Sequence, residues 1–400
     1  MEQSRIDEAR LAALQVLLHN SRGPFEGLPR TAGWGYPEPY TRDLMISALG
    51  LLVSRDAELV DALRRTLVAL AANQSPRGHI PSLAHDPEDR GASDTTPLFL
   101  FGLALYRKHT GQPEFLDDSA KRALLWMQYQ SPDDRTMVAQ LPTSDWRDEQ
   151  WVMGYGLYVN TLTYASLVLH GEGEAATQLR FLMNRLEPSA RPQALASAGE
   201  HSQVGPGPEG LVVPSQPFYA LWSYKVFHSD RFDLLGNSLA ILTGVASPER
   251  ARDLVNWVET ECEGLRKAGD LVGELPPCLF PYILPGDADW YPRYERYNQP
   301  GEYHNGGLWP FVCAFYVAAC VAVGRHDLAV QKLHALTDLV SPWHEDKAVW
   351  GFNEWSRAQT GRPSGRDWQT WSAAMYLYAA ECVRLGETPF FDEIRARRPQ

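Results

Sequence analysis

Apolar residues recur along the whole chain at the spacing of three and four residues that is typical of amphipathic helices. Segments with the period of a strand are scarce. The sequence therefore predicts an all-α protein of roughly a dozen helices. The predicted helices cover residues 6–19, 44–55, 58–73, 96–110, 119–130, 156–170, 174–186, 216–228, 231–242, 248–267, 306–323, 328–340 and 368–385.

Short and long connections alternate between these helices. The short polar ones, such as His170–Gly173 and Val323–Asp327, are typical of helical hairpins. The long ones are rich in Pro, Gly, Trp and Asp, and loops of that length are usually functional; they cover residues 23–41, 75–94, 130–154, 187–215, 276–305 and 341–367. This alternation predicts an α/α toroid, in which inner helices form a ring inside outer ones and the long loops share one face.

The chain is predicted to form one domain. No internal repeat of fixed period is evident, which makes a regular helical solenoid the weaker interpretation. No low-complexity linker divides the sequence, so the domain is expected to cover residues 1–400. The hydrophobic fraction of 44% is enough for a large core.

Charge and aromatic content narrow the classes of partner. The net charge of −12 repels phosphate backbones and anionic membranes, so neither nucleic acid nor a membrane is an expected partner. The 13 tryptophans and 17 tyrosines favour a small sugar ligand, because such rings suit sites that are half apolar and half wet. The same aromatic surface is compatible with a homo-oligomer.

The cysteines and histidines give no sign of a metal or a disulfide framework. The five cysteines are odd in number and lack the C-x-x-C spacing, and His304 has no second histidine at the spacing of metal ligands. The first residues form no apolar signal segment, and no run reaches the roughly 18 apolar residues of a membrane span. We expect a cytoplasmic protein without metal or cofactor.

Three segments in the last hundred residues combine carboxylate, amide, imidazole and indole groups: Glu302–Pro310, Phe352–Trp355 and Trp368–Trp371. A sugar needs this mixture, since its C–H faces stack on aromatic rings and its hydroxyls pair with carboxylates and amides. Together with two earlier loops, these segments supply the candidate substrate-binding residues. They are Tyr36, Arg42, Asp43, Asp94, Tyr303, His304, Asn305, Trp309, Asn353, Trp355, Gln369 and Trp371.

Glutamate 354 is the candidate general base of a glycoside hydrolase. Such enzymes use one carboxylic acid to protonate the departing oxygen and one carboxylate on the opposite face of the sugar. Glu354 lies between Asn353, whose amide can orient it, and Trp355, whose indole can limit its solvation. A surface acid or a helix cap is the structural alternative for this residue.

The candidate general acids are Asp145 and Asp148, on either side of Trp146 and Arg147. Burial against a tryptophan would raise the pKa of a carboxyl group, as an acid catalyst requires, whereas the neighbouring arginine would lower it. One of the two is expected to protonate the leaving group and the other to bind the sugar. From the residues alone the choice stays open.

Several of these candidates also have a structural interpretation. Asp43 and Asp94 stand where a helix begins and suit an N-cap, which for Asp94 is the favoured role unless its loop faces a pocket. His304 suits a buttress of its loop as well as a hydrogen bond to a sugar. For each tryptophan taken alone, packing in the core is the default.

At these residues the chain resembles the alkaline/neutral invertases, a family of glycoside hydrolases, and more distantly the glycosidases that include glycogen debranching domains. The segments that carry the resemblance are Tyr40–Asp43, Tyr303–Pro310 and Gln369–Trp371, and further similar positions extend from about Trp34 to Tyr378. The resemblance implies an (α/α)6 toroid and an inverting hydrolase of sucrose.

The resemblance also implies roles for single residues. Glu354 matches the general base, through an acid before an aromatic residue and the later pair Thr360–Gly361. Counting back from Gly154–Asn160 favours Asp148 over Asp145 as the general acid, and Asp94 matches a residue that binds sugar hydroxyls. The segments around Asp148 and Glu354 differ from those of plant invertases, which leaves another short α-glucoside open as substrate.

Three alternatives to an invertase are compatible with the sequence. One is a hydrolase of another α-glucoside, similar to amylo-α-1,6-glucosidase. The second is a sugar 2-epimerase, because those enzymes use similar toroids, although they rely on paired histidines and only His304 lies in a sugar-like segment. The third, a sugar-binding toroid without activity, gives no reason for two well-placed acids.

Overall fold

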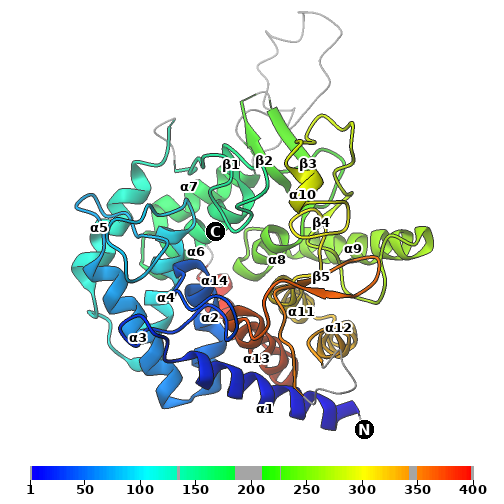
Figure 1. Cartoon of the computed structure of the whole chain (residues 1–400). Helices are drawn as coiled ribbons and strands as arrows, with labels where there is room; N and C mark the ends of the chain where they lie inside the picture. The colour runs from blue at the N-terminus through cyan, green and yellow to red at the C-terminus, as the bar shows by residue number, and fades with distance from the viewer. Residues whose placement is uncertain (1, 133–135, 185–209, 226, 342–348, 398–400) are drawn as a thin grey trace, which may run out of the picture.

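The computed structural model describes residues 2–132, 136–184, 210–225, 227–341 and 349–397, and in this part most of the chain is helical (Figure 1). The helices are α1 (Glu2–Asn20), α2 (Thr41–Ser54), α3 (Ala57–Ala72), α4 (Thr95–Thr110), α5 (Asp117–Gln128), α6 (Leu157–Leu169), α7 (Gly173–Asn184), α8 (Leu234–Thr243), α9 (Pro248–Ala268), α10 (Tyr294–Tyr297), α11 (Pro310–Ala322), α12 (His326–Leu339), α13 (Thr370–Leu385) and α14 (Phe391–Ala396). The strands are β1 (Tyr155–Gly156), β2 (Ala220–Tyr224), β3 (Phe227–Asp233), β4 (Leu279–Phe280), β5 (Trp355–Ser356) and β6 (Pro363–Ser364).

A closed ring of helices forms the centre of the molecule. In the order α2, α4, α6, α8, α11 and α13, each helix packs against the next, and α13 packs against α2 (Figure 1). Residues 310–321 of α11 are all buried, as are residues 370–383 of α13. A helix that is buried on every side must be apolar all round, and these sequences largely are.

Five of the other long helices cover the outside of this ring. Helix α1 packs on α13, α3 on α2 and α4, α5 on α4, α7 on α6, and α12 on α11 and α13. These helices are amphipathic: in α3 the buried residues include Leu59, Leu63, Leu67 and Leu70, which lie on one face. The predicted alternation of inner and outer helices is therefore present.

The helix predicted for residues 216–228 is wrong. This stretch contains β2, the turn at Lys225 and the start of β3, within an antiparallel sheet of order β1-β2-β3-β4. Phe218–Tyr224 is rich in aromatic side chains, which fit a pleated, half-buried surface better than a helix. The long loop predicted for residues 187–215 lies mostly outside the described residues.

The long connections bring the helix N-termini to one face. Five of the ring helices, α2, α4, α6, α8 and α11, end in a short connection to the next long helix, and the long loops and the sheet precede the ring helices, so the N-terminal ends of the ring helices point the same way. Two helices begin later than predicted, at Pro310 and Thr370, because Gly306 and Trp368 have positive φ angles that a right-handed helix does not allow. The residues before these helices thus belong to the loop face.

Two further features of this fold are the apolar length of its helices and the state of its cysteines. Among the described residues, the long helices all fall short of the apolar length needed to cross a bilayer. All five cysteines are buried and free of disulfide bonds.

Candidate active site

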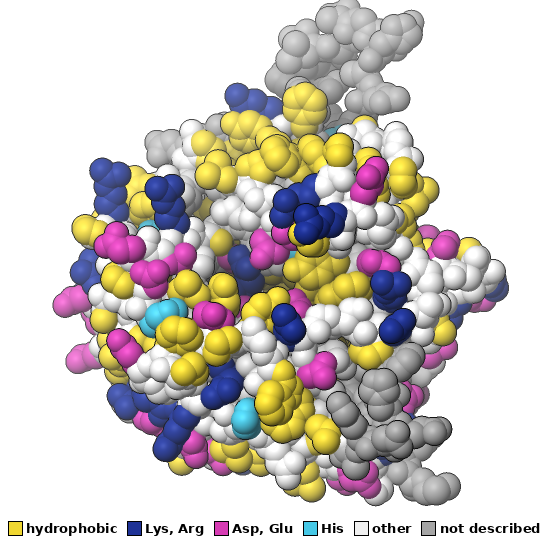
Figure 2. Space-filling model, viewed as in Figure 1, with side chains coloured by type: hydrophobic (Ala, Val, Ile, Leu, Met, Phe, Trp, Pro, Cys, Tyr) yellow, Lys and Arg dark blue, Asp and Glu magenta, His cyan; other side chains and the backbone are white. Residues whose placement is uncertain are grey.

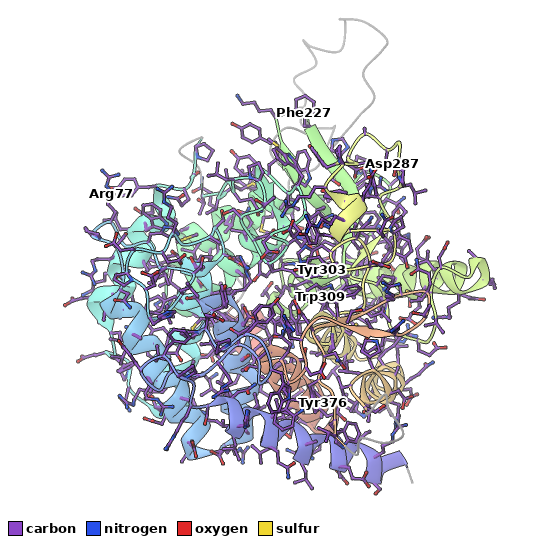
Figure 3. All side chains as sticks on the ribbon, in the orientation of Figure 1. Arg77, Phe227, Asp287, Tyr303, Trp309 and Tyr376 are labelled. Carbon is purple, nitrogen blue, oxygen red and sulfur yellow. The ribbon has the colours of Figure 1, made fainter. Side chains whose placement is uncertain are left out.

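Polar residues gather where the N-terminal ends of the ring helices meet. The space-filling view shows acidic and basic side chains among hydrophobic ones near the middle of this face (Figure 2), and the stick view shows Tyr303 and Trp309 there (Figure 3). The N-terminus of a helix carries unpaired N–H groups and a positive partial charge, which favours carboxylates. The loop face is thus suited to hold several acids together.

Glu354 lies directly before β5 and is almost fully buried, with 8% of the residue exposed. Its carboxylate accepts a hydrogen bond from the backbone N–H of Arg366 at 3.1 Å. Burial raises the pKa of Glu354 to about 7; this hydrogen bond opposes the shift and the charge of Asp148 contributes to it. Glu354 can therefore exchange a proton near neutral pH.

Asp148 lies in the loop before β1 and α6, and 59% of its side chain is open to solvent. The enclosure of its loop nevertheless raises the pKa of Asp148, with Arg42 opposing and the carboxylates of Glu149 and Asp145 adding to the shift. Asp148 and Glu354 come from loops about two hundred residues apart, yet each is close enough to Tyr36 and Tyr303 to raise the pKa of these phenols. The two acids share one site.

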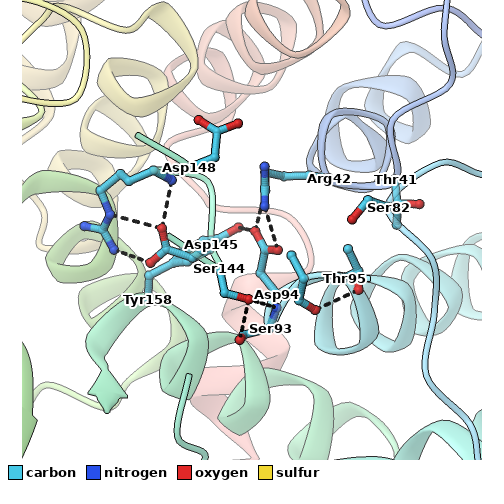
Figure 4. A network of polar contacts seen from close by, with 12 residues as sticks. Thr41, Arg42, Ser82, Ser93, Asp94, Thr95, Ser144, Asp145, Asp148 and Tyr158 are labelled. Carbon is cyan, nitrogen blue, oxygen red and sulfur yellow. Dashed lines mark hydrogen bonds and ion pairs between the residues drawn. The ribbon is translucent and has the colours of Figure 1, made fainter. Parts of the chain in front are cut away.

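Arg42 and Asp94 form a buried ion pair beside Asp148. Arg42 Nε and Nη2 donate to the Asp94 carboxylate at 2.6 and 3.1 Å (Figure 4). Asp94 occupies the N-cap position of α4 but makes no capping hydrogen bond, so the structural alternative of a cap is wrong and sugar binding stays the role predicted for it. Its carboxylate points instead at the arginine, which also faces Asp148 and lowers the pKa of that acid.

Asp43, in the first turn of α2, is a third acid of this site. Burial raises its pKa to about 8, Arg42 opposes this shift, and the charge of Glu354 adds to it. Asp43 does not occupy the N-cap position of α2, which is held by Tyr40. Its placement leaves sugar binding as the role predicted for it.

Asp145 does not reach the surface of the site. It is completely buried and paired with Arg147, whose Nη2 lies 2.7 Å from Asp145 Oδ2 (Figure 4). On its other side Arg147 pairs with Asp233 at 3.0 Å, where β3 meets α8. Burial alone would raise the pKa of Asp145, but the charge and hydrogen bonds of Arg147 lower it below its ordinary value. Asp145 is thus placed to support the loop that carries Asp148.

His304 lies buried beside Asp148. It is 1% exposed, stacks on Tyr303 with ring centroids 4.0 Å apart, and its Nε2 lies 3.9 Å from Asp148 Oδ1. Burial, aided by the charge of Arg147, lowers the pKa of His304 well below its ordinary value. The imidazole is therefore neutral at pH 7 and can donate or accept a hydrogen bond as its tautomer allows.

Asn305, predicted to bind substrate, holds its own loop together instead. Its Oδ1 accepts from the backbone N–H of Ile283 at 2.7 Å, and its Nδ2 donates to the carbonyl groups of Ile283 and Asn298 at 2.8 and 2.9 Å. The side chain is fully buried and its donors are occupied, so a sugar cannot reach it.

Two of the predicted aromatic sugar contacts belong to the core. Trp309 is 1% exposed and donates through Nε1 to the Tyr303 carbonyl at 2.9 Å, and Trp371 is 5% exposed and stacks on Phe311. These tryptophans therefore pack beneath the residues of the site, such as Tyr303, and do not line its surface. Gln369 is also buried, and its Oε1 accepts no hydrogen bond from the described residues.

Asn353 and Trp355 flank Glu354 as predicted, but the amide does not orient the carboxylate. Asn353 Nδ2 donates to Asp367 Oδ1 at 2.5 Å, and the backbone of Arg366 takes the orienting role. Trp355 is half-buried and its ring lies 5.7 Å from that of Tyr303.

Sequence reasoning missed two residues of the site. Tyr158 is buried in the first turn of α6, and its hydroxyl lies 3.4 Å from Asp94 Oδ2. Arg366 is exposed and its guanidinium lies 5.8 Å from the centre of the Tyr36 ring. Tyr158 falls within the segment Gly154–Asn160, from which the position of the general acid is counted. The sequence thus places Tyr158 near the site, but it does not indicate that the side chain faces Asp94.

The arrangement offers two separate carboxyl groups with a raised pKa, which can exchange protons. Within the described ranges, no group of three His, Cys, Asp or Glu side chains has the geometry of a metal site.

A sequence model of the family described as alkaline and neutral invertase matches residues 225–385. This match includes Tyr303, His304 and Glu354 and begins well after Asp148. Alkaline/neutral invertase CINV1 of Arabidopsis thaliana is 33% identical over 177 residues, which are 42% of this chain and 29% of that protein. Mitochondrial neutral/alkaline invertase 1 of rice is 29% identical over 170 residues, 41% of this chain. The aligned stretch covers only 25% of the rice protein.

Solved glycosidases share the fold over nearly the whole chain. A protein described as wild-type glycosidase gives a TM-score of 0.63 at 14% identity and covers 99% of this chain, with 98% of its own length aligned. The GH63 mannosylglycerate hydrolase of Thermus thermophilus, in complex with glucose, gives 0.60 at 15% identity and covers 92% of this chain and 99% of its own. The resemblance predicted from the sequence is therefore confirmed: the chain is similar to alkaline and neutral invertases over residues 225–385, on a fold that it shares with glycosidases.

Proposed function

We propose that this protein is an inverting glycoside hydrolase that acts on sucrose or a similar small α-glucoside. The observation that carries the proposal is the meeting of Asp148 and Glu354 in one site, with a raised pKa on both carboxyl groups. Similarity to invertases and to glycosidases of the same fold supports this class of reaction. The closed ring of helices supports an (α/α)6 toroid as the architecture, within one catalytic domain over residues 1–400.

In this mechanism Asp148 is protonated and gives its proton to the glycosidic oxygen, so that the bond to the anomeric carbon breaks without forming an alkoxide. Glu354 is ionised and takes a proton from a water molecule, whose oxygen attacks the anomeric carbon from the opposite face. After one turnover Asp148 is ionised and Glu354 protonated, and a proton returns through solvent. The configuration at the anomeric carbon is inverted.

The residues between the two acids suit sugar hydroxyls. Asp43, the Arg42–Asp94 pair and His304 offer acceptors and donors, and Tyr36 and Tyr303 offer aromatic rings with polar tips. The partner is therefore a small sugar. A homo-oligomer and a cytoplasmic location stay part of the proposal.

The decisive experiment follows sucrose hydrolysis by proton NMR. The anomeric signals of α-glucose and β-glucose are separate, and an inverting enzyme must release β-glucose first from an α-glucoside. Trehalose, isomaltose and free glucose serve as parallel substrates. Initial release of α-glucose would contradict inversion. Conversion of a free sugar to its 2-epimer would favour the epimerase. Those enzymes rely on paired histidines, whereas His304 is the one histidine among the described residues of this site.

The rate should depend on pH through both acids. Glu354 acts as a base only when ionised, so kcat/KM should rise with pH through an apparent pKa of about 7. Asp148 acts only when protonated, so the rate should fall where this acid loses its proton, and its raised pKa moves that fall to higher pH than for an ordinary aspartate. The two apparent pKa values of this profile belong to Asp148 and Glu354 as a coupled pair. A pH–rate profile with a maximum below about pH 5 would contradict the assignment, because Glu354 would then be protonated.

A further inference from the structure

The carboxylate of Glu354 rests on the main chain of a β-hairpin. Strands β5 and β6 pair antiparallel, and beyond their ends Glu354 N–H donates to the Arg366 carbonyl at 3.0 Å. The Arg366 N–H donates back to Glu354 Oε2 at 3.1 Å. The backbone on both sides of the carboxylate thus fixes its direction, where the sequence suggested the amide of Asn353.

Gly365, the residue before Arg366, leaves the space that this carboxylate occupies. A Cβ atom at position 365 would stand 2.4 Å from Glu354 Oε2 and 2.5 Å from Glu354 Cβ. Separations below 3.0 Å between such atoms do not occur without a shift of one of them. Gly365 is itself exposed, so packing in the core does not explain the need for a residue without a side chain.

We propose that Gly365 is a positioning residue for the general base: its missing side chain lets the Glu354 carboxylate lie against the hairpin and accept the Arg366 N–H. This inference rests on the proposed function, because it assigns the effect to catalysis. A carboxylate moved by about 1 Å from its productive position can cost about 100-fold in rate.

The test is Gly365→Ala, with Gly361→Ala as matched control. Both glycines lie in the same hairpin region and have similar positive φ angles, +76° for Gly365 and +68° for Gly361. A Cβ atom at Gly361 would meet only Val272 Cγ1, at an ordinary 3.4 Å. Both variants thus carry the same kind of backbone strain, and only Gly365→Ala presses on Glu354.

For Gly365→Ala we expect kcat on sucrose to fall about 10- to 100-fold with little change in KM. The acidic limb of the pH–rate profile should move to higher pH, because the displaced carboxylate loses the N–H that favours its charged form. Gly361→Ala should keep kcat and the limb of the wild type. Equal kcat values and equal limbs for the two variants would overturn the proposal while leaving the proposed function intact.

A measurement that does not depend on turnover separates the two proposals. The pKa of the Glu354 carboxyl group is followed by carbon NMR, with the signal assigned by its loss in Glu354→Gln. If the wild type hydrolyses no glycoside, the proposed function fails and this titration still decides the placement of the carboxylate. A rise of the pKa in Gly365→Ala but not in Gly361→Ala supports the contact, and an unchanged pKa in both overturns it.

Discussion

Replacing Glu354 by glutamine should lower kcat for sucrose about 10²- to 10⁴-fold, the usual contribution of a general base. Glutamine keeps the shape of the side chain but cannot take a proton from water. Because the sugar contacts proposed for Asp43, Arg42 and His304 remain, the dissociation constant for glucose, measured by calorimetry, should stay within a few-fold of the wild type. Glu302→Gln is the control, since Glu302 pairs with Arg357 at 3.3 Å on a neighbouring loop.

The same substitution makes an unusual prediction for stability. The folded-state pKa of Glu354, about 7, is above that of the unfolded chain, so the folded state binds more protons between these values. The stability that the protein owes to protonated Glu354 is present at low pH and is lost as pH rises through about 7. Glutamine removes this dependence. The melting temperature of Glu354→Gln should therefore gain on the wild type between about pH 5 and about pH 8.

Two results would contradict this account of Glu354. Near-normal turnover in Glu354→Gln would remove its role as base. A melting-temperature difference between Glu354→Gln and the wild type that stays the same from about pH 5 to about pH 8 would show that the pKa of Glu354 is not raised.

The helical ring could be predicted because its sequence pattern depends on burial alone. Helix α11 is apolar on every side, and α3 has one apolar face, so the two classes are distinct in the sequence. The helix predicted for residues 216–228 was wrong because the aromatic residues of this stretch suit either a buried helix or a strand. The pairing of β2 with β1 and β3 decides between the two, and this pairing is a property of the fold.

The types of residue in the candidate site could be predicted from the sequence, but the sequence does not indicate which of them face the site and which lie behind it. Glu354 and Asp148 lie in the site, as their neighbours suggested, while Asp145 and Asn305 have similar chemistry and lie behind it. The difference is the direction of each side chain. Asn305 is turned towards the backbone of Ile283, and Asp145 is turned towards Arg147, whose second partner is Asp233. No spacing in the sequence relates Asp233 to Arg147, and this pairing is set only by the fold.

The ion pairs around Arg147 give the second large prediction, which concerns stability. Arg147→Met should lower the free energy of unfolding by about 3 to 5 kcal/mol, the usual cost of removing one partner from a buried ion pair. Methionine fills much of the volume but leaves Asp145 and Asp233, both fully buried, without a counter-charge. Chemical denaturation at pH 7 measures the change.

Arg293→Met is the matched control for this substitution. Arg293 pairs with Glu149, a near neighbour of Arg147 in the chain, but 62% of its side chain is exposed, and exposed ion pairs contribute about 0 to 1 kcal/mol. A loss in Arg147→Met no larger than that in Arg293→Met would show that the buried charges are not compensated by Arg147.

The pH dependence of this loss separates charge from packing. With Arg147 present, the folded-state pKa of Asp145 is below its ordinary value, so this carboxylate contributes stability above the pKa of the unfolded chain and loses it as pH falls. Without Arg147, Asp145 and Asp233 can take up protons at low pH, which removes the free-energy cost of an unpaired buried charge. The difference in stability between Arg147→Met and the wild type should therefore narrow as pH is lowered from about 7 to about 4. A constant difference would mean that the variant suffers from packing alone, and that Arg147 holds the loop of Asp148 by its shape and not by its charge.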